Sequence, residues 1–315
     1  MQAIDELDEL DEHDDENTPS RQEAAKRSTL VSVFVNIGLT IGQVTTGILA
    51  GSAGLIADGI HSLSDLVADF VVLFANHHSQ KAPDEDHHYG HQRYENAASL
   101  TLGLLLLAVG VGMLWGAFHK IEQPGAIQQV KSIAIWVALA ALLAKELLFR
   151  YMLNVAQKVR SSMLIANAWH ARSDAAASLV VAVGIAGSLL GYPMLDPLAA
   201  MIVGFMVTKM GWSFAWDALQ DLMDRAVDDE TVQAIRVTLT ETPGVLGWHD
   251  LKTRKAGDMI LVDVHLEIDA DITVEQGHDI ALDARRRVME RHAVLDLMTH
   301  VDPLRIKPSP PQGVV

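Results

Sequence analysis

Residues 99–118 read SLTLGLLLLAVGVGMLWGAF, a continuous apolar stretch that contains no charged side chain. An α-helix needs roughly 20 mainly apolar residues to cross the ~30 Å hydrocarbon core of a bilayer. The stretch therefore predicts a transmembrane helix over residues 97–118.

Further segments on both sides have the length and apolarity that the same prediction requires. They cover residues 29–50, 55–76, 130–154, 162–190 and 195–213. The predicted membrane domain is therefore all-α, has six helices and spans residues 28–213. The segments 55–76 and 162–190 differ from the others because each carries ionisable residues in its middle.

Basic residues near the helix ends favour one orientation, because short cytoplasmic loops carry an excess of Lys and Arg. Such residues precede the first helix and occupy the loops after the second and fourth helices, whereas the turns after the first and fifth helices have none. We therefore expect both termini to face the cytoplasm. Membrane lipid is expected around the helices.

Charge is concentrated outside the apolar segments. The formal net charge of the 315 residues is −16, although half of them are hydrophobic. Residues 1–27 begin with an acidic stretch that predicts a disordered tail, and residues 308–315 form a second tail. Basic residues form no patch, so nucleic acid is not an expected partner. Cysteine is absent, so a metal site must use His, Asp, Glu or backbone oxygen.

The segment 214–307 is predicted to be a compact domain of mixed structure. Helices are expected over 228–241 and 274–292, and strands over 247–255, 258–268 and 294–302. In the second strand, alternate apolar residues share one face. The order α-β-β-α-β predicts an α+β domain with its helices on one face of the sheet.

Two pairs of ionisable residues lie inside predicted membrane helices: His61 with Asp65, and His170 with Asp174. Residues four apart lie on one helical face. Two such helices side by side would offer two imidazoles and two carboxylates, which are normal zinc ligands. A charged residue near the bilayer centre costs about 2.5–3.5 kcal/mol on insertion scales, so a function is expected for it. The alternative is interhelical hydrogen bonding or a proton relay without metal.

Two polar clusters lie outside the membrane helices. The loop 82–91 holds several carboxylates and imidazoles that could bind a metal or form a solvated polar loop. In the C-terminal domain, His300 and Asp302 point to one face of a strand, and His265 lies opposite the apolar face of its own strand. With His249 on the neighbouring strand, these residues could bind metal between two subunits or remain solvated.

Several stretches in this order resemble the cation diffusion facilitator family, over about residues 28–303. They are GSAGLIADGIHSLSD (51–65), DHHYGHQRYEN (86–96), WHARSD (169–174), LDPLAA (195–200), GWHDLKTRKAG (247–257), HLEID (265–269) and HVDP (300–303). The sequence is most similar to the bacterial zinc- and iron-efflux branch of this family of divalent metal/proton antiporters.

The resemblance implies three metal sites and a homodimer with a metallochaperone-like cytoplasmic domain. The implied ligands are His61, Asp65, His170 and Asp174 for transport, Asp84, His87 and His91 in the loop, and His249, His265, His278, His300 and Asp302 in the cytoplasmic domain. Much of the bacterial branch has Asp where this chain has an imidazole at position 61. This difference favours zinc over iron and cadmium.

The expected function is proton-coupled efflux of divalent metal cations, zinc above others, from the cytoplasm by alternating access. Zinc would be both the transported substrate and a regulatory ligand, and protons the counter-substrate. The alternative is a membrane-embedded metal sensor that binds zinc without transport. An enzyme is not expected, because an intramembrane metalloprotease would need a His-Glu-x-x-His motif, which is absent.

Overall fold

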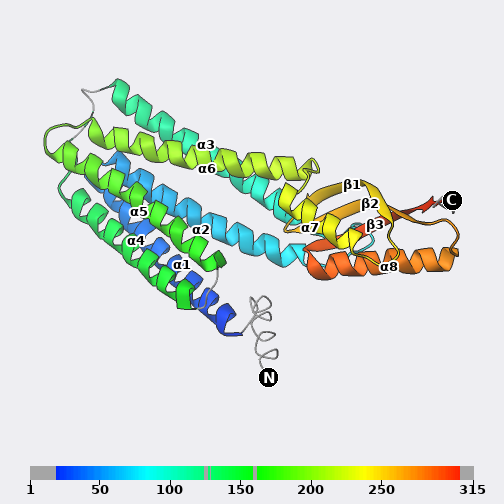
Figure 1. Cartoon of the computed structure of the whole chain (residues 1–315). Helices are drawn as coiled ribbons and strands as arrows, with labels where there is room; N and C mark the ends of the chain where they lie inside the picture. Colours follow the sequence, from blue (N-terminus) through cyan, green and yellow to red (C-terminus); the bar gives the residue numbers. More distant parts are fainter. Residues whose placement is uncertain (1–18, 124–126, 128, 159–161, 306–315) are drawn as a thin grey trace, which may run out of the picture. The chain divides into compact units, whose positions relative to one another are not determined.

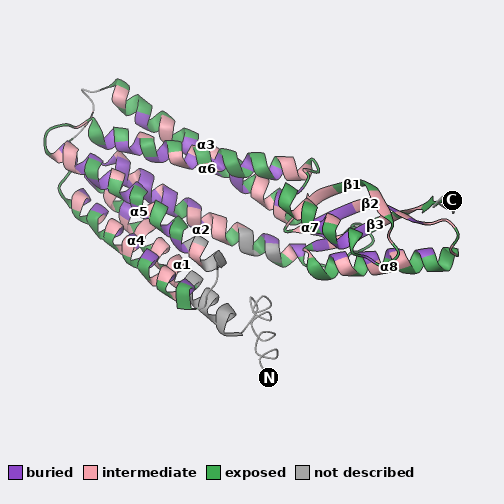
Figure 2. Ribbon diagram, in the orientation of Figure 1, coloured by how far each residue is buried: buried purple, intermediate pink, exposed green. Residues whose placement is uncertain are grey.

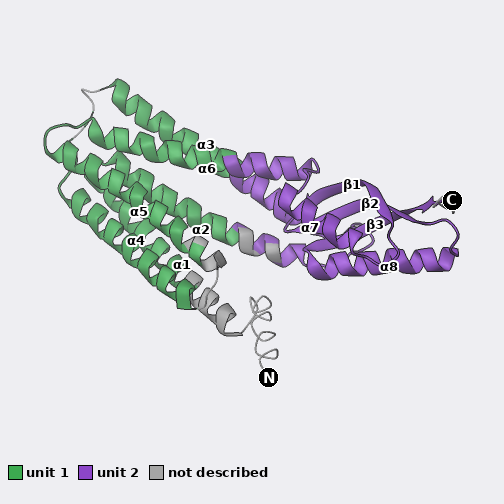
Figure 3. Ribbon diagram, viewed as in Figure 1, with its two compact units in different colours: residues 1–70, 104–212 green, residues 71–103, 213–315 purple. Residues whose placement is uncertain are grey.

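The computed structural model describes residues 19–123, 127, 129–158 and 162–305. These residues form two compact units (Figure 3). The first comprises residues 1–70 and 104–212, and the second comprises residues 71–103 and 213–315. Most of the expected N-terminal tail and all of the C-terminal tail lie outside the described residues.

Six long helices precede the C-terminal domain, as predicted (Figure 1). They are α1 (Pro19–Ala50), α2 (Ala53–Ser79), α3 (Arg93–Glu122), α4 (Ile133–Lys158), α5 (Ser162–Leu189) and α6 (Leu195–Leu222). Stretches of α1, α3, α5 and α6 are long and apolar enough to cross a membrane. Among the described residues, no such stretch is found in α2 or α4.

The helices of the first unit contact one another through small residues and present large apolar side chains outward. Its core cluster includes Ala57, Ala134 and Ala138, which allow the helices to approach closely. Trp115 of α3 and Phe205 of α6 are more than half exposed, and exposed residues recur along both helices (Figure 2). Apolar side chains exposed in this number are typical of a surface that faces lipid.

The C-terminal domain has the predicted α-β-β-α-β order. It comprises α7 (Asp229–Thr240), β1 (Gly247–Ala256), β2 (Met259–Asp269), α8 (Val274–Arg291) and β3 (Val294–Leu304). The sheet order is β1-β2-β3, with β1 antiparallel and β3 parallel to β2. Val264 and Leu266 of β2 pack with Ala284 and Val288 of α8 in the core, so the helices cover one face of the sheet.

Local signals explain where the helices of this domain begin. The Asp228 side chain accepts a hydrogen bond from the Thr231 backbone at the start of α7. Thr273 and Gln276 form a reciprocal capping box at the start of α8. Both arrangements satisfy backbone N–H groups that have no partner inside the helix.

The start of α3 and the β1–β2 turn contact each other within the second unit. The side chains of Glu95 and Asn96, at the start of α3, accept hydrogen bonds from the backbone N–H groups of Asp258 and Gly257. Gly257 has φ +62°, and a Cβ there would lie 2.5 Å from a Glu95 carboxylate oxygen. This turn therefore requires glycine both for its backbone conformation and for the close approach of α3.

Candidate metal sites

Three of the four ionisable residues predicted for the membrane site lie together in the first unit. His61 Nε2 is 3.5 Å from Asp174 Oδ1 of α5, and His61 Nδ1 is 3.7 Å from Asp65 Oδ1. One ligand atom from each residue lies within 4.8 Å of the others. The His61 side chain is buried, and its Nδ1 has no hydrogen-bond partner among the described residues. A buried imidazole whose Nδ1 has no hydrogen-bond partner, placed between two carboxylates, can accept a divalent cation.

His170, the fourth predicted residue, is not part of this compact group. It lies one turn before Asp174 on α5, and its side chain is exposed. It remains within electrostatic range of Asp65 and Asp174. The donor set that the structure brings together is thus one imidazole and two carboxylates, with a second imidazole at its side.

A lysine that the sequence analysis did not single out lies beside this site. Lys145 of α4 is buried and pairs with Asp58, which lies one turn before His61 on α2. The Asp58 carboxylate accepts hydrogen bonds from Lys145, Ser178 and Gln43. The sequence signal for Lys145 is a charged residue in the middle of an otherwise apolar helix, for which a function is expected.

A further carboxylate of the first unit, that of Asp196, bonds to the turn between α1 and α2 and to the start of α2. Asp196 of α6 accepts hydrogen bonds from Ser52 Oγ at 2.5 Å and from the backbone N–H groups of Ala53 and Gly54 at 2.6 and 3.2 Å. These N–H groups belong to the first turn of α2, so the carboxylate caps the helix and complements its dipole. The role of the LDPLAA stretch at this position is therefore structural.

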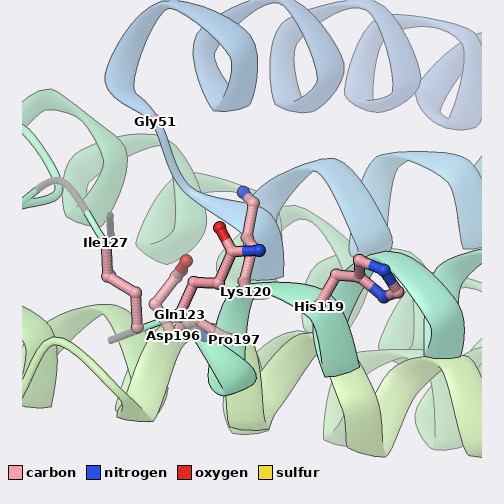
Figure 4. Close-up of a pocket in the computed structure, with 7 residues that line it drawn as sticks. All are labelled: Gly51, His119, Lys120, Gln123, Ile127, Asp196 and Pro197. Atoms are coloured by element: carbon pink, nitrogen blue, oxygen red, sulfur yellow. The ribbon is translucent and has the colours of Figure 1, made fainter. Parts of the chain in front are cut away.

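A pocket of about 370 Å³ lies next to this cap (Figure 4). It is lined by Gly51, His119, Lys120, Gln123, Ile127, Asp196 and Pro197. Its polar side chains come mainly from the C-terminal end of α3. The carboxylate of Asp196 is already occupied by the α2 cap, so the pocket has no free carboxylate for a metal among its described lining residues.

The predicted loop residues form a compact group in the second unit. Asp84 Oδ1 is 3.2 Å from His87 Nδ1, and Asp84 Oδ2 is 3.3 Å from His91 Nε2. Desolvation acts to raise the pKa of Asp84, but hydrogen bonds from the backbone of His87 and Asp86 outweigh it and hold the pKa below its ordinary value. An ionised carboxylate between two imidazoles suits zinc or a similar cation.

The strand register explains the cluster in the C-terminal domain. His249, His265 and His300 are direct neighbours across β1, β2 and β3, so their side chains share the face that the helices leave uncovered. Asp302 Oδ2 is 3.1 Å from His249 Nε2 and 3.0 Å from His265 Nδ1, and Asp302 Oδ1 is 3.4 Å from His300 Nε2. One carboxylate thus contacts three imidazoles.

Asp302 is held in its ionised form by these neighbours. Desolvation acts to raise its pKa, but the hydrogen bond with His265 and the charges of the three histidines lower it below the ordinary value. His278 lies apart from them, because it is exposed on α8, the helix that covers the opposite face of the sheet. Within one chain the predicted cytoplasmic site therefore has four of its five residues together.

Comparison with known proteins shows the family of this chain. The description "Cation efflux transmembrane domain" matches residues 29–223, and "Cation efflux protein, cytoplasmic domain" matches residues 227–304. Metal tolerance protein 2 of Oryza sativa subsp. japonica is 34% identical, over 90% of this chain and 79% of its own length. The Bacillus subtilis manganese efflux system protein MneS is 33% identical, over 88% and 95% of the two chains.

A third relative is the magnetosome protein MamB of Magnetospira sp. (strain QH-2), which is 34% identical over 87% of this chain and 93% of its own length. The two family descriptions together span the six helices and the α+β domain. The chain therefore belongs to the cation diffusion facilitator family, whose members carry out efflux of divalent metal cations across a membrane.

Proposed function

We propose that this transporter exports zinc from the cytoplasm in exchange for protons, by alternating access to a site formed by His61, Asp65, His170 and Asp174. The observation that carries the proposal is the buried His61 imidazole with a carboxylate on either side, from α2 and α5. Membership of a family of transporters sets aside the alternative of a sensor that binds metal without moving it.

Proton exchange follows from the chemistry of these ligands. A metal binds neutral imidazole and ionised carboxylate, so protons compete with it and affinity falls as acidity rises. Histidine changes its charge between about pH 5 and 8 in the ordinary case, which makes the competition effective at physiological pH. A site that opens outward to a more acidic solution would exchange its metal for protons and return to the cytoplasm protonated.

Zinc is favoured by the imidazole at position 61, and by His170 if it joins the site. Imidazole suits zinc, whereas carboxylate and water suit manganese. Manganese is the second candidate, because MneS is named as a manganese efflux protein and because the compact group contains two carboxylates and one imidazole. A comparison of both metals in one assay separates these candidates.

The remaining parts of the proposal concern assembly and regulation. We infer a homodimer in the inner membrane with both termini in the cytoplasm, a membrane domain over residues 28–213 and a cytoplasmic domain over 214–307. The loop group around Asp84 and the sheet group around Asp302 would bind zinc as regulatory sites, with His278 a further ligand. The exposed position of the sheet group makes it accessible to metal from solution.

The test is uptake by purified protein in lipid vesicles. We expect zinc uptake to require a pH gradient with the acidic side inside the vesicle, for molecules whose cytoplasmic face is outside. Asp174→Ala should reduce uptake to the level of empty vesicles, because it removes one of the four proposed metal ligands. Uptake that ignores the gradient would contradict proton exchange, and normal uptake by folded Asp174→Ala would contradict the site.

A further inference from the structure

A buried ion pair lies beside the intramembrane metal site. Lys145 Nζ of α4 donates to Asp58 Oδ1 at 2.9 Å, and the side chains are 3% and 0% exposed. The other oxygen of Asp58 accepts from Ser178 Oγ at 2.7 Å and from the amide of Gln43. Three side chains, from α1, α4 and α5, therefore meet at the carboxylate of Asp58 on α2.

The sequence positions of these residues connect the pair to the metal ligands. Asp58 precedes His61 by three residues on α2, and Ser178 follows Asp174 by four residues on α5. Residues at these spacings lie on the same helical face. The bond between Ser178 and Asp58 thus joins the two ligand-bearing helices one turn from the site. The charge of Lys145 acts electrostatically on both His61 and Asp174.

The burial of two charges needs an explanation beyond helix packing. Burying an ion pair is often no more stabilising than burying apolar residues of similar volume. Neutral side chains could join the same helices by hydrogen bonds. Asp65 and Asp174 supply two negative charges, which match one divalent cation. Asp58 adds a third negative charge nearby, and the ammonium group of Lys145 cancels it.

We propose that Asp58 and Lys145 are positioning residues that form a charge-balancing pair and so set how tightly the membrane site holds its divalent cation. Through Ser178 the Asp58 carboxylate also joins α2 to α5, and through Gln43 it joins α2 to α1. The inference rests on the proposed role of the His61 site in transport. It concerns the strength of binding and adds no ligand to the site.

The two members of the pair have opposite effects on the metal in this proposal. Asp58→Asn leaves an uncompensated ammonium group that repels the cation, so the KM for metal should rise on the order of tenfold. Lys145→Met leaves an additional carboxylate that attracts the cation, so KM should stay the same or fall. The double variant restores the charge and should return KM close to the wild-type value.

A purely structural pair predicts a different pattern. Loss of either partner would then loosen the helices, raise KM and lower kcat in both single variants. The double variant would be no better than the single variants. The direction of the KM change in Lys145→Met therefore separates charge balance from packing.

The experiment measures KM and kcat for Zn²⁺ and for Mn²⁺ uptake into proteoliposomes by the full chain. The matched control on α4 is Glu146→Gln, which removes a charge from the next residue, whose carboxylate pairs with Arg150 on the exposed side of the helix. It should leave KM unchanged. Ser178→Ala removes one hydrogen bond to Asp58 without a change of charge and should change KM less than Asp58→Asn.

Folding is checked by thermal melting without metal. If Lys145→Met does not fold, Lys145→Gln keeps a hydrogen-bond donor for Asp58 without the charge and answers the same question. A raised KM in a folded, uncharged Lys145 variant overturns the inference, as does an unchanged KM in Asp58→Asn. In the same vesicles, normal uptake by Asp174→Ala would overturn the proposed transport site, so the two failures are distinguishable.

Discussion

At the scale of single residues, the imidazole of His61 is the group of the proposed transport site that we expect to influence the choice of metal most. It lies between Asp65 and Asp174, and exchanging it for a carboxylate makes the donor set harder and more anionic. We expect His61→Asp to shift the ratio of zinc to manganese uptake towards manganese by on the order of tenfold. A competition assay in vesicles measures the ratio, with His77→Asp, an exposed position at the end of the same helix, as the control. An unchanged ratio would mean that geometry sets the selectivity.

The sequence indicated some residues of this site and missed others for a physical reason. His61 and Asp65 share a helical face, so their spacing alone predicted that they lie together. Lys145 is 87 positions from Asp58, and no local pattern links the two. A helical repeat says which residues share a face, but it does not say which helix covers that face. His278 was expected at the cytoplasmic site only from the family resemblance, whereas the predicted order of helices and strands already placed the helices on the face opposite His265.

At the scale of elements, the close contact of α3 with α6 depends on glycine. A Cβ at Gly110 would lie 2.6 Å from the backbone nitrogen of Thr208, whereas a Cβ at Gly112 would meet no atom within 4 Å. We expect Gly110→Ala to destabilise the protein by about 1–3 kcal/mol, because overpacking forces the helices apart. Gly112→Ala, two residues away on the same helix, should be neutral or stabilising, because alanine favours the helix. Thermal melting of both purified variants tests this, and equal melting temperatures would contradict the α3–α6 contact.

The boundaries of helices and strands were predicted more accurately in the C-terminal domain than in the membrane helices α1 and α6. The predicted strands and helices of the C-terminal domain agree with the observed ones to within one or two residues, because alternation and capping mark their ends. The membrane helices α1 and α6 extend further than the apolar segments did. The α1 helix begins at Pro19, within the expected tail, and α6 continues to Leu222. The length of an apolar segment reflects the thickness of the bilayer. A helix can extend beyond the bilayer into water where its residues have high helix propensity, so apolarity alone does not mark its ends.

At the scale of the whole molecule, we propose that metal bound by the sheet cluster, which consists of His249, His265, His300 and Asp302, regulates transport. Its three histidines lie on one uncovered face of the sheet and contact the carboxylate of Asp302. A ligand that binds only the folded state stabilises it by RT ln(1 + [L]/Kd), about 2.7 kcal/mol at a hundredfold excess over Kd. Zinc should therefore raise the melting temperature of the isolated fragment 217–307. Replacing His300 and Asp302 together by alanine should remove most of that increase.

In the full chain, the same double variant should slow transport without stopping it, because the proposed transport ligands lie on α2 and α5, in the other compact unit. A matched double variant is Arg286→Ala with Glu290→Ala, an exposed pair on α8 that contacts no residue of the cluster in the described chain. It should change neither the zinc-dependent increase in melting temperature nor the rate of uptake. An absent zinc effect on melting would remove the regulatory site. Complete loss of uptake by a folded His300/Asp302 variant would mean that the sheet cluster belongs to the transport cycle itself, since a site that only adjusts the rate cannot be indispensable for it.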